Sequence, residues 1–173
     1  DNTGSLVKSG VVTSLSSVIN KSAYPSAVLS GVSFNYQQWG IPIAVSNIAL
    51  ATNLSLVPSG APKTWKEPES SATSLISSGK ANVGIVTHLD GYFLQPFFDS
   101  LGGYVFANKN GSYTNTKQVG LYSKSLAKNA SLMDSWLQKK IFDKSNTYDG
   151  SNFTNGKAPY SLVGPWSIAG LDK

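Results

Sequence analysis

Short apolar segments alternate along this chain with segments of helical spacing, and this alternation limits the possible fold more than any other feature. Apolar runs bounded by polar residues, Gly or Pro predict strands at residues 39–45, 47–52, 81–87 and 158–163. Helical spacing and capping residues predict helices at residues 64–79, 90–101, 123–142 and 149–155. Strands that alternate with helices are typical of an α/β domain, here with a mixed sheet flanked by helices.

The residues between these segments predict further, smaller elements. We expect a short helix followed by a loop in residues 4–19, a hairpin around Asn110-Gly111 in residues 104–113, and a helix that begins at Trp166. At 173 residues the chain has the length of one domain, so we expect a single domain over residues 1–173. The chain begins at Asp1 rather than Met and shows no signal peptide, which indicates a processed form or a fragment.

Charge and composition exclude several classes of function. The net charge is +5, but all fourteen cations are Lys, and only Lys139 and Lys140 are adjacent. Without Arg the chain has no planar fork for guanine or phosphate, so we do not expect a nucleic-acid partner. The absence of Cys excludes disulfides and thiolate chemistry. No apolar run reaches the ~18 residues of a membrane span.

Groups for acid–base catalysis are scarce, so we do not expect an enzyme. His88 is the only histidine, and no Gly-X-Ser-X-Gly motif accompanies it. A helix that carries Asp90 and Asp99 separates them by roughly 13 Å along its axis, which is too far for a glycosidase pair. Neither a metal site nor a cofactor is expected, because carboxylates are not clustered around the histidine.

Residues suited to ligand binding lie just after two predicted strands. Asp90 follows residues 81–87, and ligands of open α/β sheets bind at the carboxyl ends of strands. The adjacent Tyr92 and Phe93 point about 100° apart on a helix, so one ring can line a cleft while the other packs. Trp166 follows a strand, and Tyr148 lies in a polar loop. Two alternatives stay open: Asp90 as a helix cap and Trp166 as a core residue. Three tryptophans sit beside or within packed elements, and we interpret them as structural: Trp39, Trp65 and Trp136.

Several motifs occur in an order and at a spacing that match one known family. They are Ile41-Pro42-Ile43-Ala44-Val45, residues 62–67 (Pro-Lys-Thr-Trp-Lys-Glu), residues 102–106 with 110–113, and residues 156–158 running to Gly164-Pro165-Trp166. This pattern resembles maltose/maltodextrin-binding proteins, which are extracytoplasmic solute-binding proteins of ABC sugar importers. The whole chain is similar to one continuous middle part of that family, chiefly its C-terminal lobe.

The resemblance implies one lobe of a periplasmic-binding-protein-like fold, in which sugar is held between two lobes. Residues 1–40 then form a leading segment near the crossover between the lobes, and most of the N-terminal lobe is missing. The implied partners are an oligosaccharide, the membrane subunits of an ABC permease and that missing lobe. The implied location is periplasmic or at the cell surface, and the implied function is binding of a maltodextrin-type sugar for import.

The same resemblance assigns roles to individual residues. Asp90 corresponds to an acidic sugar-binding residue, Tyr92 to a stacking tyrosine, Tyr148 to a second binding tyrosine and Trp166 to the stacking tryptophan after Gly-Pro. By the same resemblance, Phe93 is expected to line the same pocket.

The chain departs from the family pattern at two places. The family's Glu-Pro-Tyr-Phe is Asp90-Gly91-Tyr92-Phe93 here, and Ser46 stands where the family has an acidic residue. An oligosaccharide is therefore expected more firmly than maltose itself. Two alternatives keep the fold: a sugar-binding domain fused to or inserted in the permease subunit, and an interaction module that has lost its ligand.

Overall fold

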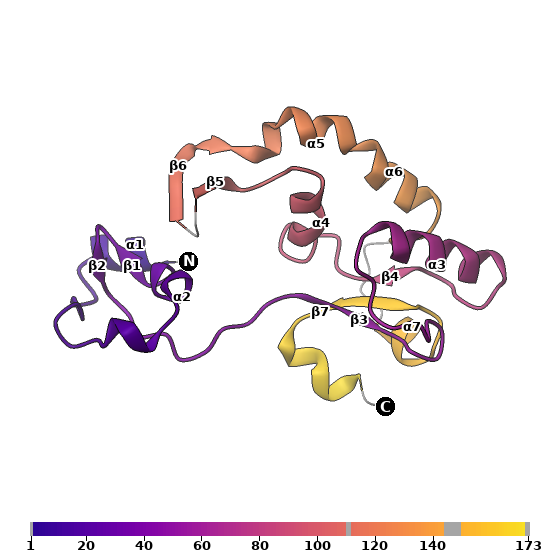
Figure 1. The fold of residues 1–173 in the computed structure, drawn as a ribbon, viewed down its shortest axis with the longest axis horizontal. Helices are drawn as coiled ribbons and strands as arrows, with labels where there is room; N and C mark the ends of the chain where they lie inside the picture. Colours follow the sequence, from indigo (N-terminus) through magenta and orange to yellow (C-terminus); the bar gives the residue numbers. More distant parts are fainter. Residues whose placement is uncertain (1, 110–111, 144–149, 172–173) are drawn as a thin grey trace. The chain divides into compact units, whose positions relative to one another are not determined.

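The computed structural model describes residues 2–109, 112–143 and 150–171. The chain divides into two compact units (Figure 1). The first unit contains residues 1–45 and 106–119, and the second contains residues 46–105 and 120–173. The second unit carries the sheet and every described residue of the expected site, so most of the fold description concerns it.

The first unit is built from short elements. These are α1 (Thr3–Lys8), η1 (Lys21–Ala23), α2 (Ser26–Ser30), β1 (Ser33–Phe34), β2 (Gln37–Gln38), β5 (Phe106–Lys109) and β6 (Ser112–Val119). The helix and loop predicted in residues 4–19 are confirmed by α1 and the irregular chain after it. Strands β5 and β6 pair antiparallel, which confirms the predicted hairpin within its described residues.

A second hairpin, between β1 and β2, was not expected from the sequence. Its two turn residues, Asn35 and Tyr36, both have positive φ, at 49° and 62°. Two left-handed residues match the right-handed twist of adjoining strands. Gln38 is buried in β2, and its side-chain amide donates to the carbonyl oxygens of Leu29 and Val32. These bonds offset the cost of burying the amide.

The strand predicted at residues 39–45 is wrong. The structure has no strand there, and the side chains of Ile43 and Val45 are 97% and 72% exposed. Pro42 has no N–H, and no described residue forms a strand ladder with this segment.

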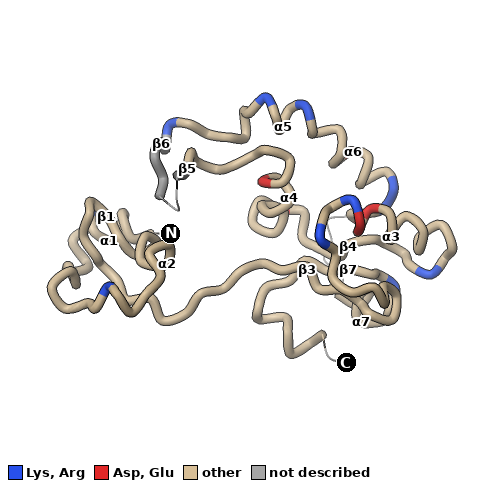
Figure 2. Tube along the Cα trace, in the orientation of Figure 1, with Lys and Arg blue, Asp and Glu red and all other residues tan. Residues whose placement is uncertain are grey.

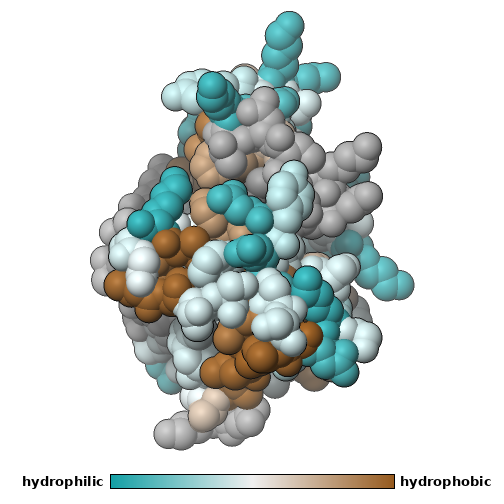
Figure 3. Space-filling model, turned by 90° about the vertical axis from the view of Figure 1, so that its left-hand side faces the viewer, coloured by the Kyte–Doolittle hydropathy of each residue, from teal (hydrophilic) through white to brown (hydrophobic). Residues whose placement is uncertain are grey.

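Figure 3 views the side of α1 and β2, where brown apolar groups are separated by pale and teal polar residues.

The second unit contains a three-stranded mixed sheet in the order β3–β7–β4. Its strands are β3 (Ala49–Thr52), β4 (Ile85–Val86) and β7 (Tyr160–Val163). Strand β7 runs antiparallel to β3 and parallel to β4. Its helices are α3 (Lys66–Ser77), α4 (Gln95–Ser100), η2 (Gly120–Tyr122), α5 (Lys124–Asn129), α6 (Ser131–Gln138), α7 (Ser151–Thr154) and η3 (Pro165–Gly170). The strands expected at 47–52, 81–87 and 158–163 are therefore present, although β4 is short.

Side chains of the sheet alternate between two apolar clusters. On one face Ile85, Tyr160 and Leu162 join residues from α3, α4 and α6 in the main core. On the other face Val86 joins Phe153 of α7 in a smaller cluster. Helices thus cover both faces, which confirms the predicted α/β class with a mixed sheet flanked by helices.

Four aromatic rings form the centre of the main core. The ring of Phe97 lies 4.9 Å from that of Trp136 and 5.3 Å from that of Phe142. Trp65 meets Phe97 and Trp136 edge-on, with centroid distances of 5.4 and 5.9 Å. Edge-to-face contacts at this range are favourable. The prediction that Trp65 and Trp136 are structural is confirmed.

An ion pair on the surface joins α3 to the residue after α6. Lys139 Nζ donates to Glu69 Oε1 at 2.8 Å. This hydrogen bond holds the pKa of Glu69 below its ordinary value. Partly exposed pairs of this kind add little to stability, so the apolar core is the main contact between these helices.

The prediction of one continuous helix at residues 123–142 is wrong, because the structure has two shorter helices there. Ser123 caps its start as expected, with its hydroxyl accepting from the amide of Leu126 at 3.0 Å. At Ala130 the helix divides into α5 and α6, because the amide of Met133 bonds three residues back, to Ala130, instead of four. Lys140 then adopts a left-handed conformation, with φ 57°, and ends α6.

Figure 2 shows lysines spread along the chain rather than gathered in one stripe. Within residues 2–109, 112–143 and 150–171, no helix combines the length and the apolar character needed to cross a membrane.

Candidate functional site

A tight turn after β4 places the first residues of the candidate site. One carboxylate oxygen of Asp90, Oδ1, accepts hydrogen bonds from the backbone amides of Tyr92 and Phe93, both at 2.9 Å. The carbonyl oxygen of Asp90 also accepts from the amide of Leu94 at 3.0 Å. The capping role expected for Asp90 is therefore confirmed, although it caps a turn and α4 begins only at Gln95.

Apolar anchors that follow this turn in the chain decide which ring faces solvent. Leu94 and Phe97 are buried in the main core, with 3% and 0% exposure. With these positions fixed, Phe93 is half-buried and Tyr92 is 59% exposed. Of the two adjacent rings, Phe93 therefore packs and Tyr92 faces solvent, and a role for Tyr92 in lining a ligand cleft stays a prediction.

Trp166 reaches the same region from a different part of the sequence. Strand β7 ends at Val163, and Pro165 opens η3 two residues later. Proline suits the first position of a helix, because its fixed φ matches the helix and because an N–H at this position would have no acceptor within the helix. The indole of Trp166 is 62% exposed. This exposure decides against the alternative in which Trp166 is a core residue.

Tyr92, Phe93 and Trp166 meet in what we call the aromatic cluster. The rings of Tyr92 and Trp166 are nearly parallel, at 26° and 6.4 Å between centroids. Phe93 meets both rings edge-on, at 5.6 Å from Tyr92 and 6.4 Å from Trp166. These separations lie in the favourable range for aromatic pairs. Residues 74 positions apart in the sequence thus form one surface with two exposed rings.

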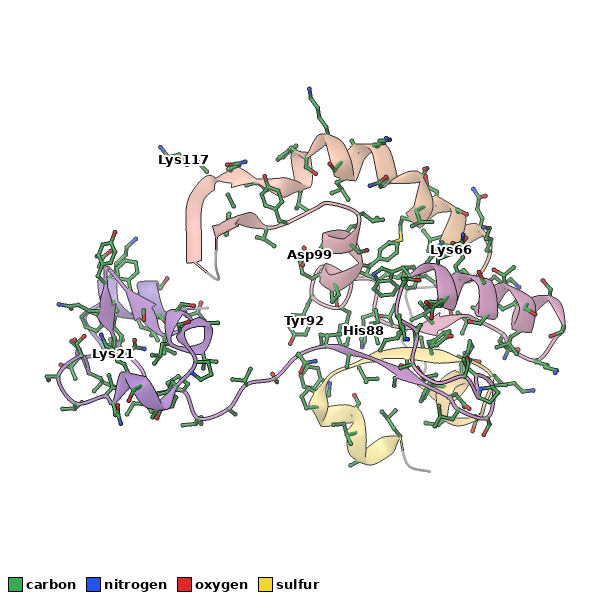
Figure 4. The ribbon with its side chains drawn as sticks, viewed as in Figure 1. Lys21, Lys66, His88, Tyr92, Asp99 and Lys117 are labelled. Atoms are coloured by element: carbon green, nitrogen blue, oxygen red, sulfur yellow. The ribbon has the colours of Figure 1, made fainter. Side chains whose placement is uncertain are left out.

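His88 is a neighbour of this surface that the sequence analysis did not include among the expected site residues. Its ring lies 4.9 Å from that of Phe93. In Figure 4, Tyr92 and His88 lie between α4 and η3, whereas Asp99 is on α4 itself. Asp99 accepts a hydrogen bond from Gln95 one turn earlier in the same helix. The position of His88 between β4 and Asp90 was the signal that could have placed it beside the cluster.

The arrangement supplies two kinds of contact to a ligand. The exposed rings offer apolar faces, and Oδ2 of Asp90 accepts no hydrogen bond from the residues that the structure describes. Asp90 is exposed, so this second oxygen is available to donors in solution. Tyr148, the remaining predicted site residue, lies outside the described residues.

All 173 residues match the family model of bacterial extracellular solute-binding proteins. The chain belongs to this family. The galactooligosaccharide-binding protein of Bacillus subtilis (strain 168) is 26% identical over 157 residues, which cover 86% of this chain and 37% of that protein. The maltotriose-binding protein of Pyrococcus abyssi (strain GE5 / Orsay) is 26% identical over 148 residues, which cover 82% of this chain and 31% of that protein.

These matches confirm the resemblance first indicated by the sequence motifs. The chain spans about a third of the length of both curated relatives. The family is one of binding proteins, and this agrees with the scarcity of acid–base groups in the chain.

Proposed function

We propose that this solute-binding protein binds an oligosaccharide of the maltodextrin type through the aromatic cluster and Asp90. It acts outside the cytoplasm and passes the sugar to the membrane subunits of an ABC importer. The observation that carries the proposal is the near-parallel pair of exposed rings, Tyr92 and Trp166, together with Asp90, whose Oδ2 accepts no hydrogen bond from the described residues and whose Oδ1 binds the amide of Tyr92. The two relatives, a galactooligosaccharide-binding and a maltotriose-binding protein, support a sugar as the ligand.

The chemistry of a sugar fits these groups. A pyranose ring presents C–H groups on its faces, which pack against aromatic rings, and hydroxyl groups around its edge, which need acceptors. Tyr92 and Trp166 supply the apolar contact, and Oδ2 of Asp90 supplies a charged acceptor, which gives stronger hydrogen bonds than a neutral one. Because Oδ1 already holds the turn, binding requires no rearrangement of the backbone around Asp90.

The cluster is open, so it contacts only one side of a sugar. Binding sites for small molecules normally bury 70–90% of the ligand, as a general rule. We therefore propose that a second, N-terminal lobe covers the other side, and that closure of the two lobes signals a loaded protein to the permease. In this proposal residues 1–173 contribute a C-terminal-lobe-like part, and Tyr148 adds a further contact.

A titration of the full-length protein with sugars, followed by tryptophan fluorescence, tests the proposal. Maltose, maltotriose and a galactotriose are compared with the monosaccharides glucose and galactose. Maltotriose is expected to change the fluorescence in a saturable way, because Trp166 is exposed and would be covered. Saturation only with the galactotriose would replace the maltodextrin specificity and keep the class of ligand. If no sugar gives a saturable change, the chain is an interaction module without a sugar ligand.

Two substitutions at Asp90 separate its role in the turn from its role in binding. Asp90→Asn keeps an oxygen for the amides of Tyr92 and Phe93 but removes the charge, so we expect an unchanged melting temperature and about tenfold weaker maltotriose binding. Asp90→Ala removes the cap as well and should also lower the free energy of unfolding by about 1 kcal/mol. Calorimetry measures both quantities. Equal sugar affinity of Asp90→Asn and the wild type would exclude Asp90 as a charged acceptor.

A further inference from the structure

The indole of Trp166 lies directly against the backbone of Gly164. A Cβ atom built on Gly164 would lie 2.3 Å from both Cη2 and Cζ2 of Trp166 and 2.6 Å from Cε2. Distances this short cannot occur between real carbon atoms, so any side chain at position 164 displaces the ring or the backbone. The six-membered half of the indole therefore occupies the space that a Cβ would fill.

The backbone of Gly164 does not itself require glycine. Its φ and ψ are −98° and 170°, an extended conformation that every residue type adopts. Gly156, six residues after Gly150 in the same unit, differs because its φ is 68°, in the left-handed region. At position 164 the absence of a Cβ is what matters, because the three atoms nearest to a Cβ built there are all ring atoms of Trp166.

We propose that Gly164 is a positioning residue, which holds the Trp166 ring near-parallel to Tyr92 by leaving room for it. The proposal rests on the sugar-binding function proposed above and extends it to a residue that does not touch the ligand. Pro165 stiffens the link between Gly164 and Trp166, since its φ is nearly fixed. The ring is 62% exposed, so an added Cβ can turn it toward solvent without disturbing the core.

The substitution Gly164→Ala tests this, with Gly170→Ala as its matched control. Gly170 lies in the same segment, and a Cβ there would meet no atom within 4 Å. In the full-length protein we expect Gly164→Ala to weaken maltotriose binding about tenfold, the size of one lost aromatic contact. Gly170→Ala should bind as the wild type does. Wild-type affinity in Gly164→Ala would overturn the proposal.

The orientation of the ring is also measured without sugar. Of the four tryptophans in residues 1–173, Trp166 is the most exposed, since Trp136 is buried and Trp39 and Trp65 are half-buried, so the difference in acrylamide quenching between the variant and the wild type reports on the Trp166 ring. Gly164→Ala should change both this quenching and the near-ultraviolet circular dichroism of the Tyr92–Trp166 pair, whereas Gly170→Ala should change neither. If the wild type binds no sugar, the function proposed above fails, and these spectra still decide whether Gly164 positions the ring.

A double substitution separates positioning from general damage. If Gly164 acts only through the indole, Gly164→Ala adds nothing to the loss of binding caused by Trp166→Ala. Any loss of thermal stability caused by Gly164→Ala should likewise disappear in the double variant, because the ring that collides with the new methyl group is gone. Additive losses of binding, or a loss of stability that persists without the ring, would show that Gly164 acts on the fold instead.

Discussion

Replacing Trp166 with Ala is expected to weaken maltotriose binding about thirtyfold and to leave the stability of the protein almost unchanged. A buried aromatic anchor in a binding surface commonly contributes about 2 kcal/mol, which corresponds to this factor. Trp166 is 62% exposed without ligand; its ring stacks on Tyr92, meets Phe93 edge-on and lies against the backbone of Gly164. We therefore expect the removal of this ring to lower the free energy of unfolding by less than about 0.5 kcal/mol. Isothermal titration and urea unfolding of the full-length protein measure the two effects.

Two further variants make this expectation specific. Trp166→Phe keeps a flat apolar ring of smaller area and should lose only part of the affinity. Tyr122→Ala removes an aromatic residue that is 90% exposed in η2 and has no part in the proposed site, and this variant should bind sugar as the wild type does. A Trp166→Ala protein that retains the wild-type dissociation constant would remove the central residue from the proposed site.

Replacing Trp136 with Ala, in contrast to Trp166→Ala, is expected to cause a large loss of stability. Trp136 is fully buried and packs against Phe97, Phe142 and Trp65. Truncating a buried tryptophan removes its transfer free energy and leaves a cavity, at a cost of about 4 kcal/mol. Urea unfolding followed by far-ultraviolet circular dichroism should show a lower midpoint, and the measurement is made at low temperature to keep the variant folded in the absence of urea.

The neighbours of Trp136 link this loss to the site. Phe97 lies in α4, directly after the turn that carries Tyr92 and Phe93, so the aromatic core anchors that turn. Trp136→Phe, which leaves a smaller cavity, should recover part of the stability. A loss below about 1 kcal/mol for Trp136→Ala would mean that the four-ring core can collapse around the gap, and that the turn is anchored mainly by Leu94.

Local chemistry was a reliable guide where one residue decides the backbone. The carboxylate of Asp90 and the hydroxyl of Ser123 satisfy nearby amides, as their side chains predict. The sequence was a poor guide where apolar character alone suggested a strand. Residues 39–45 are apolar enough for a buried strand, but a strand exists only where a neighbour supplies its hydrogen bonds.

The hairpin at Asn35 and Tyr36 was missed for a related reason. Tyrosine rarely adopts positive φ, so nothing in its identity signals a left-handed turn. The division of residues 123–142 into α5 and α6 was equally hidden, since Ala130 favours helix and the break is one hydrogen bond closed over three residues instead of four.

By itself the sequence determined the α/β class, the family, and the residue types that a sugar site requires, because hydrophobic periodicity, caps and motif order are local or one-dimensional properties. Only the tertiary structure decided that Tyr92 and Trp166 share one surface. Their approach depends on β4 and β7 lying side by side and parallel, so that the chain leaves both strands at the same edge of the sheet. The packing of the indole over Gly164, where a Cβ would lie 2.3 Å from the ring, is likewise a tertiary contact that no pattern of residue types encodes.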